Sequence, residues 1–440
     1  MEQFVATCAS VLWGWPMIIL LVGTHLLLTV RLRFPQRHIL RAIRLSVQSD
    51  KGASGDMSQF AALATSLAAT IGTGNIVGVA TAITLGGPGA VFWCWLTGIF
   101  GIATKYSEAL LAVKYRVTTP KGKMLGGPMY ALERGLGQKW LAVLFCVFCA
   151  IATFGIGNMV QSNAIAVILN ENYGIATWHT GVATALLVAL VLIGGVHSLG
   201  KVCSALVPFM ALFYVMGCLY ILCTNAPFVW PALKLIVVSA FSPQAVGGGT
   251  AGGALILTIR YGVARGLFSN ESGMGSAPIV AAAAKTATPV RQALVSSTGT
   301  FWDTVVICAI TGLVLVSTSL HYPDIVNSID NGNLTQAAFG KIPVVGTPLL
   351  SVGIITFAFS TLLGWSYYGE RCVEYLVGHR FILPYRLLFV VAVVVGSTTR
   401  LAMVWNIADV FNALMAIPNL ISLILLSGVI VSETRKHEAS

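Results

Sequence analysis

The sequence predicts an all-α polytopic membrane protein with about 11 transmembrane helices. Of its 440 residues, 56% are hydrophobic and only 9% are charged, whereas a water-soluble domain carries about a quarter charged residues. Apolar runs long enough to cross a hydrocarbon layer of roughly 30 Å recur along the chain, as around Val182–Val196. Glycine clusters interrupt two of these runs, and glycine destabilises a helix interior, so we expect two discontinuous helices.

Polar segments with glycine and proline separate the apolar runs. By length, the expected spans cover about 11–32, 57–85, 88–113, 140–168, 178–198, 202–224, 232–264, 292–318, 345–377, 383–400 and 404–432. The first span is followed by Arg31, Arg33 and Arg37 and by no small-residue cleavage site. It is therefore read as a retained helix and not as a signal peptide.

The net charge of +11 follows the positive-inside rule and predicts no nucleic-acid partner. If the first helix runs from outside to inside, the segments 31–56, 114–139, 265–291, 371–386 and the C-terminal tail face the cytoplasm. They hold most of the basic residues, Arg265 among them, and the outside keeps only Lys234, Lys341 and Arg400. We therefore expect a bacterial inner-membrane protein with its N-terminus outside and its C-terminus in the cytoplasm.

The two interrupted spans occupy matching places in the chain. Span 57–85 is interrupted at 71–75, and span 232–264 is interrupted at 246–253. Without the first helix they become the first and sixth of ten spans, which is the pattern of an inverted-repeat transporter with broken central helices. The expected parts are 1–56 (extra helix and basic linker), 57–224 (first five-helix repeat), 225–432 (inverted second repeat) and 433–440 (cytoplasmic tail). The alternative is that these glycines only let helices pack closely.

An unwound turn inside the membrane exposes backbone groups, and it is tolerated only where it lines a cavity or binds a ligand. Its N–H groups suit a carboxylate, and its carbonyls suit a sodium ion or an ammonium group. Thr73 and Asn75 add polar side chains at the first break, and neither predicted break contains a carboxylate. That absence favours a zwitterionic substrate and weakens a proton-coupled mechanism.

Further polar side chains lie within apolar spans. Ser360 and Thr361 are hydroxyls suited to a hard cation, and Trp365 lies one turn beyond Thr361. Equally, these hydroxyls could bond only to their own helix. Either Gln161 or Asn163 is expected to face a cavity or a neighbouring helix.

The charged residues within the spans give less information about function. Lys105 and Glu108 read as a structural pair three residues apart. An enzyme would need paired carboxylates, a histidine cluster or a metal motif at membrane depth, but the seven histidines are dispersed. A channel would need a continuous polar stripe, whereas the polar residues cluster near the midplane. Neither class is favoured.

Three stretches of the sequence, 72–80 (GTGNIVGVA), 86–95 (GGPGAVFWCW) and 265–273 (RGLFSNESG), resemble the alanine or glycine:cation symporter family, the sodium:alanine symporters of the APC superfamily. The resemblance implies a LeuT-type fold of five plus five inverted helices after one extra N-terminal helix. It also implies sodium-coupled uptake of alanine, glycine or serine by alternating access, with the monomer sufficient. The alternative on the same fold is a proton-coupled transporter of another small amino acid.

The resemblance also implies site residues. The amino-acid pocket would comprise Thr73, Gly74, Asn75, Gln161, Gly249, Thr250, Thr361 and Trp365, and sodium, the co-transported ion, would be bound by the carbonyls of Ala68 and Ile71 and the hydroxyls of Ser360 and Thr361. Thr250 stands where the family commonly has Phe, and Cys94 stands where it usually has Met. The pair Asn270-Glu271 is expected to cap a helix or gate the inner mouth.

Overall fold

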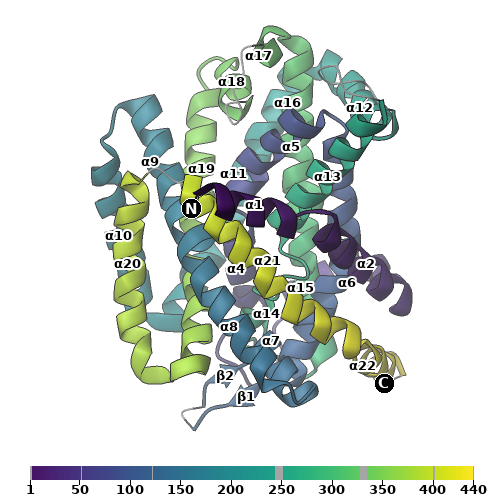
Figure 1. The fold of residues 1–440 in the computed structure, drawn as a ribbon, viewed down its shortest axis with the longest axis vertical. Helices are drawn as coiled ribbons and strands as arrows, with labels where there is room; N and C mark the ends of the chain where they lie inside the picture. Colours follow the sequence, from purple (N-terminus) through teal and green to yellow (C-terminus); the bar gives the residue numbers. More distant parts are fainter. Residues whose placement is uncertain are drawn as a thin grey trace.

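The computed structural model describes residues 2–50, 52–120, 122–242, 251–327, 334–399 and 402–439, and nearly all of them are helical (Figure 1). The helices are α1 (Glu2–Leu12), α2 (Trp15–Arg31), α3 (Ile39–Ser46), α4 (Gln59–Thr70), α5 (Val79–Gly86), α6 (Ala90–Lys114), α7 (Pro128–Tyr130), α8 (Lys139–Phe154), α9 (Val160–Tyr173), α10 (Thr177–Ile193), α11 (Gly195–Thr224), α12 (Ala226–Phe241), α13 (Ala251–Asn270), α14 (Pro278–Ala281), α15 (Pro289–Thr300), α16 (Ala309–His321), α17 (Asp324–Asn327), α18 (Leu334–Gly340), α19 (Gly346–Val377), α20 (Ile382–Thr398), α21 (Ala402–Leu425) and α22 (Ser427–Ala439).

Short elements join or continue these helices. Stretches of wider, π-helical winding are η2 (Gly74–Gly78), η3 (Ala131–Gly135), η4 (Gly155–Met159) and η5 (Phe301–Cys308), and single tight turns are η1 (Pro35–His38) and η6 (His379–Phe381). The strands β1 (Val117–Thr118) and β2 (Met124–Leu125) pair antiparallel, with Val117 opposite Leu125. This hairpin lies at the lower end of the molecule in Figure 1, below α7 and α8.

Seven helices of the described chain are long and apolar enough to cross a membrane. They are Gln3–Arg31, Lys139–Tyr173, Gly195–Thr224, Pro289–His321, Gly346–Val377, His379–Thr398 and Met403–Leu425. An eighth is the bent pair Gln59–Thr70 and Gly74–Gly86, whose halves meet at 54°. The predicted fold class is thus confirmed. The other expected spans correspond to α6, α10 and α12–α13, which are helical but fail that test, so the count of eleven stays a prediction.

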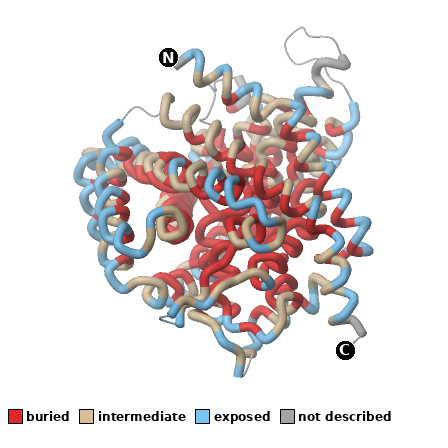
Figure 2. The backbone as a smooth tube through the Cα atoms, turned by 60° about the horizontal axis from the view of Figure 1, so that its bottom comes forward, coloured by how far each residue is buried: buried red, intermediate tan, exposed pale blue. Residues whose placement is uncertain are grey.

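The molecule has an apolar core and, around it, an outer surface that is also largely apolar. The central helix α19 contacts α4, α8, α9 and α11, and Figure 2 shows buried backbone at the centre with exposed helices around it. The helices α10 and α20 lie side by side at one edge in Figure 1 and expose Leu187, Leu190, Leu387 and Leu388. Such a continuous exposed apolar face fits hydrocarbon rather than water.

The second interrupted region differs from the prediction in detail. Span 232–264 contains α12 and α13, and α13 already begins at Ala251, so Gly252 and Gly253, which were expected in the break, are helical. The residues 243–250, including Gly249 and Thr250, lie outside the described residues. A further irregular segment follows α13 at 271–277, with positive φ angles of 52° at Glu271, 92° at Gly273 and 86° at Gly275. The helix α13, which leads into this segment, packs beside the first break, because it contacts both η2 and α5.

Two segments that were expected to face the cytoplasm contain helix. Arg265, at the start of segment 265–291, lies within α13, because that helix continues to Asn270. Residues 433–439 of the expected tail form the end of α22, and Nζ of Lys114 lies 2.9 Å from Oε1 of Glu433. The hydrogen bond from Lys114 lowers the pKa of the Glu433 carboxyl.

Glycine lets the central helix approach the first broken helix. A Cβ on Gly364 of α19 would lie 2.6 Å from both the backbone nitrogen and the Cβ of Ala69 in α4. A Cβ essentially never lies within 3.0 Å of another heavy atom. The two helices would therefore have to separate to accommodate a larger residue at Gly364. Gly364 therefore fixes how closely α19 packs on α4.

We expect Gly364→Ala to destabilise the protein by about 1–3 kcal/mol, the usual cost of overpacking a core. The measurement is the midpoint of thermal unfolding in detergent. Gly428→Ala is the matched control, because nothing lies within 4 Å of a Cβ built at Gly428 in α22. An unchanged midpoint for Gly364→Ala would contradict the close packing of α19 on α4.

Candidate functional site

The first broken helix is held open by its own side chains. The helix α4 is capped at its start by Ser58, whose Oγ accepts a hydrogen bond from the backbone N–H of Ala61. At the break, Ile71 is extended (φ −75°, ψ 91°). The backbone N–H of Gly72 donates to Oδ1 of Asn75 at 2.9 Å and so leaves the carbonyl of Ala68 without its helical partner. Asn75 thus stabilises the break and frees a carbonyl.

Oxygen atoms gather at this break. Oγ of Ser360 lies 3.0 Å from the carbonyl oxygen of Ala68 and 3.4 Å from that of Ile71, and Oγ1 of Thr361 lies 3.4 Å from the carbonyl oxygen of Ile71. Both hydroxyls also lie 2.9 Å from the carbonyl oxygen of Phe357. Two hydroxyl hydrogens therefore serve three carbonyl oxygens. An excess of acceptors of this kind suits a hard cation, which takes oxygen ligands.

Close approach of α19 makes this oxygen cluster possible. A Cβ on Gly72 would lie 2.6 Å from Oγ1 of Thr361, so any larger residue would push α19 away from the break. The glycine cluster thus has a packing role as well as a backbone role. The predicted alternative, in which Ser360 and Thr361 bond only to their own helix, is incomplete, because Oγ of Ser360 also reaches Ala68 in α4.

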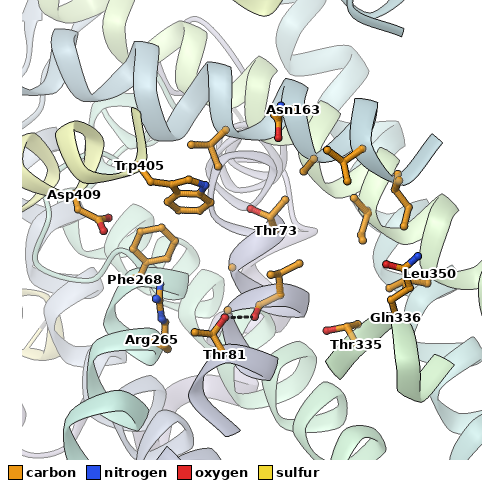
Figure 3. Close-up of a pocket in the computed structure, with 18 of the residues that line it drawn as sticks. Thr73, Thr81, Asn163, Arg265, Phe268, Thr335, Gln336, Leu350, Trp405 and Asp409 are labelled. Carbon is orange, nitrogen blue, oxygen red and sulfur yellow. Dashed lines mark hydrogen bonds between the residues drawn. The ribbon is translucent and has the colours of Figure 1, made fainter. Parts of the chain in front are cut away.

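A cavity of about 520 Å³ leads to the other side of the break (Figure 3). Thr73 and Gly74 form part of its wall, with Phe268 of α13 and Trp405 of α21 beside them. The rings of Phe268 and Trp405 lie 6.2 Å apart, and the guanidinium of Arg265 lies 5.8 Å from the Phe268 ring. A Cβ on Gly74 would touch the Phe268 ring at 3.4 Å. Phe268 therefore packs directly on the break at the wall of the cavity.

The cavity has a charged and polar rim. Glu171, Arg265 and Asp409 line it, and Thr335 and Gln336 of α18 lie across from Phe268 and Trp405 in Figure 3. Asn163 also lines it, while its Nδ2 donates to the carbonyls of Gly396 and Thr399 at 3.1 and 3.2 Å. The prediction that Gln161 or Asn163 faces a cavity or a neighbouring helix is thus confirmed for Asn163.

The structure divides the predicted pocket residues into two groups. Thr73 and Gly74 line the open cavity, whereas Asn75, Gln161, Thr361 and Trp365 are buried behind it. Oγ1 of Thr73 and Oε1 of Gln161 are buried without a hydrogen-bond partner among the described residues. Such atoms are rare in folded proteins and indicate a place for a ligand or water. Gly249 and Thr250 lie outside the described residues.

A carboxylate supports the first break from the far side. Oδ1 of Asp303 in η5 accepts from Nδ2 of Asn75 at 2.7 Å. Its Oδ2 accepts from Oγ of Ser269 at 3.0 Å and from Oγ1 of Thr304 at 2.7 Å. Asp303 is fully buried, and hydrogen bonds of this kind are what a buried carboxylate needs. Asp303 therefore connects the first break, α13 and η5.

A second buried network holds the irregular segment 271–277. Oδ1 of Asn270 accepts from the N–H of Ser272 at 2.9 Å, which stabilises the turn after α13, and the capping or gating role of Asn270-Glu271 stays a prediction. Glu271 accepts from Nε1 of Trp365 at 3.1 Å and from Oγ of Ser276 at 2.5 Å. Since Trp365 also packs against Gly157, it connects α19 and η4 to this segment. Asp303 thus lies beside the first break and Glu271 lies in the segment after α13, while neither predicted break itself contains a carboxylate.

The predicted pairing of Lys105 with Glu108 is also corrected. Oε1 of Glu108 accepts from the N–H groups of Gly273 and Gly275 and from Nδ2 of Asn419, at 2.7–3.1 Å. The ammonium of Lys105 is buried and makes no hydrogen bond to any described residue. The carboxylate binds backbone N–H groups instead, because residues 273–275 are not helical and leave them free.

Similarity to known proteins identifies the family of this chain. The family model described as the sodium:alanine symporter family matches residues 1–440. The chain belongs to this family. Its members are transporters, so the chain is a multi-pass membrane transporter and not an enzyme, and family membership supports sodium-coupled amino-acid symport as its general activity.

Curated relatives of this symporter cover nearly its whole length. The sodium/alanine symporter AgcS of Methanococcus maripaludis is 51% identical, over 99% of this chain and 98% of that protein. An uncharacterized transporter of Haemophilus influenzae is 50% identical, over 99% of this chain and 96% of that protein. A probable sodium/glutamine symporter, GlnT of Bacillus subtilis, is 35% identical, over 99% and 91%.

Solved structures show the fold of the symporter. MhsT in complex with L-phenylalanine matches with a TM-score of 0.54 at 11% identity, over 87% of this chain and 99% of that chain. A sodium-coupled sialic acid symporter in a substrate-bound, outward-open state matches with a TM-score of 0.51 at 14% identity, over 95% and 84%. The fold is therefore of the LeuT type, as expected.

Proposed function

We propose that this transporter imports small neutral amino acids, namely alanine, glycine and serine, together with sodium by alternating access. The observation that carries the proposal is the oxygen cluster of Ala68, Ile71, Ser360 and Thr361, where acceptors outnumber hydrogens. In this proposal the cluster binds sodium and holds α19 against the first broken helix. Because the same residues shape the break, sodium and substrate binding stabilise one arrangement of the two helices.

The proposed substrate site lies between the open cavity and the oxygen cluster. The partnerless atoms Oγ1 of Thr73 and Oε1 of Gln161 are suited to polar groups of an amino acid. Free N–H groups at the start of η2 suit its carboxylate. Phe268 and Trp405 line the cavity together with Thr73, so in this proposal displacement of these rings would widen the access of the substrate. A substrate with a small side chain fits best, since Trp365, which packs against Gly157, already occupies the space behind this site.

We also propose the orientation given by the positive-inside rule. The cavity is lined by Glu171, Thr335 and Gln336, which lie in or beside segments expected outside. With the N-terminus outside, the cavity would open to the exterior of a bacterial inner membrane, which fits uptake. A single chain contains all the proposed site residues, so the monomer would suffice.

One observation favours a second candidate, coupling to protons on the same fold. Asp303 and Glu271 are buried carboxylates close to the two unwound segments, and ionisable residues at membrane depth often carry protons. Against it, hydrogen bonds already satisfy both carboxylates, and the acceptor excess lies at Ser360 and Thr361 instead.

Uptake by proteoliposomes separates these candidates. We expect labelled alanine to accumulate when an inward sodium gradient is applied at equal pH on both sides. We expect no accumulation from an inward proton gradient without sodium, and competition by unlabelled glycine and serine. Accumulation from the proton gradient alone would overturn sodium coupling, and failure of glycine and serine to compete would overturn the substrate range.

A further inference from the structure

A second cavity, of about 340 Å³, lies far from the proposed substrate site. It is formed by the start of α20 with η6, the junction of α10 and α11, and the β1–β2 hairpin. Its charged side chains are those of Lys123, Glu370, Arg380 and Arg386, and His379 also lines it. Figure 1 places the turn between α19 and α20 and the hairpin at the lower end of the molecule, which is the end that the positive-inside rule assigns to the cytoplasm.

The acid in this cavity is already neutralised. Glu370 is buried, and its Oε2 accepts from Nε of Arg386 at 2.7 Å. Its Oε1 pairs with Arg371, which also pairs with Glu374. Two guanidinium groups and two carboxylates therefore form one network at the floor of the cavity. The side chains of Lys123 and Arg380 pair with no carboxylate among the described residues, so the lining as a whole is positive.

The cavity also has an apolar rim. Ile193 and Leu383 line it and are 78% and 65% exposed on the molecular surface. They continue the exposed apolar face of α10 and α20, which includes Leu190 and Leu387. Gly195 leaves the junction of α10 and α11 open, since a Cβ there would lie 4.0 Å from Nη2 of Arg386. Basic groups thus meet a lipid-facing surface at one opening.

We propose that this cavity binds the phosphate headgroup of an anionic phospholipid. The phosphate would face Lys123 and Arg380 with Arg386 behind them, and the acyl chains would lie along Ile193, Leu383 and the face of α10 and α20. A free phosphate would satisfy the basic groups equally well but would leave the apolar rim in contact with water. Basic cavities between helices at the cytoplasmic side of a membrane are suited to anionic headgroups. Bound lipid would also cover the connection from α19, which carries Ser360 and Thr361, to α20.

The test compares two double variants of the full-length transporter in nanodiscs of equimolar phosphatidylcholine and phosphatidylglycerol. Lys123→Gln with Arg380→Gln removes the two basic groups without a carboxylate partner. Lys139→Gln with Lys436→Gln removes two exposed charges that line no part of this cavity and is the matched control. Native mass spectrometry measures phosphatidylglycerol retained per protein. Each basic residue near a membrane surface contributes about fivefold in binding, so we expect roughly 25-fold weaker retention in the first variant only.

Three results would overturn the proposal. Equal retention by wild type and the Lys123/Arg380 variant would show that the cavity does not hold lipid, and equal loss in the control would show a general effect of charge. A separate arm adds inorganic phosphate to the protein in phosphatidylcholine alone and follows the midpoint of thermal unfolding. We expect no shift. A rise that the Lys123/Arg380 variant loses would assign the cavity to free phosphate.

Discussion

We expect Thr361→Val to raise the sodium concentration for half-maximal alanine uptake by about tenfold to a hundredfold, the effect of losing one hydrogen-bonding group that meets a charge. Valine keeps the β-branched shape but lacks the oxygen that lies 3.4 Å from the carbonyl of Ile71. The Phe357 carbonyl keeps its helical partner in the variant, so the fold should survive. The measurement is the sodium dependence of initial uptake rates into proteoliposomes.

Thr356→Val is the matched control for this experiment. Oγ1 of Thr356 bonds back to the carbonyl of Val352 in the same helix α19 but contributes no atom to the oxygen cluster. We expect its sodium dependence to equal that of the wild type. If Thr361→Val retained wild-type sodium dependence, the oxygen cluster would not be the sodium site. If both variants lost sodium dependence equally, the effect would come from α19 as a whole.

The first broken helix could be predicted because its signal is local. An apolar run is interrupted within a few residues by Gly72, Thr73, Gly74 and Asn75. Glycine has a low helix propensity, so two glycines here are not expected in a continuous helix. The structure adds the roles of two of these residues: Gly72 leaves room for Thr361, and the side chain of Asn75 accepts a hydrogen bond from the N–H of Gly72. The residues proposed for sodium came from family resemblance, because spacing alone does not bring residue 68 to residue 360.

The irregular segment 271–277 was not predicted, and residues 243–250, which hold most of the predicted second break, lie outside the described residues. Residues 271–277 contain Gly273 and Gly275 among polar residues and read as an ordinary loop. Only tertiary contacts show that Glu108, from α6, binds their backbone N–H groups. Similarly, the sequence does not show that Arg265 lines a cavity, because the positive-inside rule counts charges and does not detect cavities.

Asp303 is the residue whose role depends most on such distant contacts, and its removal should have the largest effect on transport. Asp303→Ala leaves Asn75, Ser269 and Thr304 without the carboxylate that accepts their hydrogen bonds. Each buried donor without an acceptor costs about 1–3 kcal/mol. We expect alanine uptake per folded molecule to fall about a hundredfold, because Asn75 would no longer hold the first break in place. Asp303→Asn keeps an acceptor for Asn75 and should fall only about tenfold.

Uptake normalised to reconstituted protein, together with the midpoint of thermal unfolding, separates transport from folding. Asp324→Ala is the control, since it removes an exposed carboxylate that pairs with Lys341 at 2.6 Å and lies far from the break in sequence. If Asp303→Ala lowered only the unfolding midpoint while the folded protein transported at the wild-type rate, Asp303 would serve the fold alone. The graded result, with Asn between Asp and Ala, is expected only if the bond from Asn75 to this side chain is what connects η5 to the site.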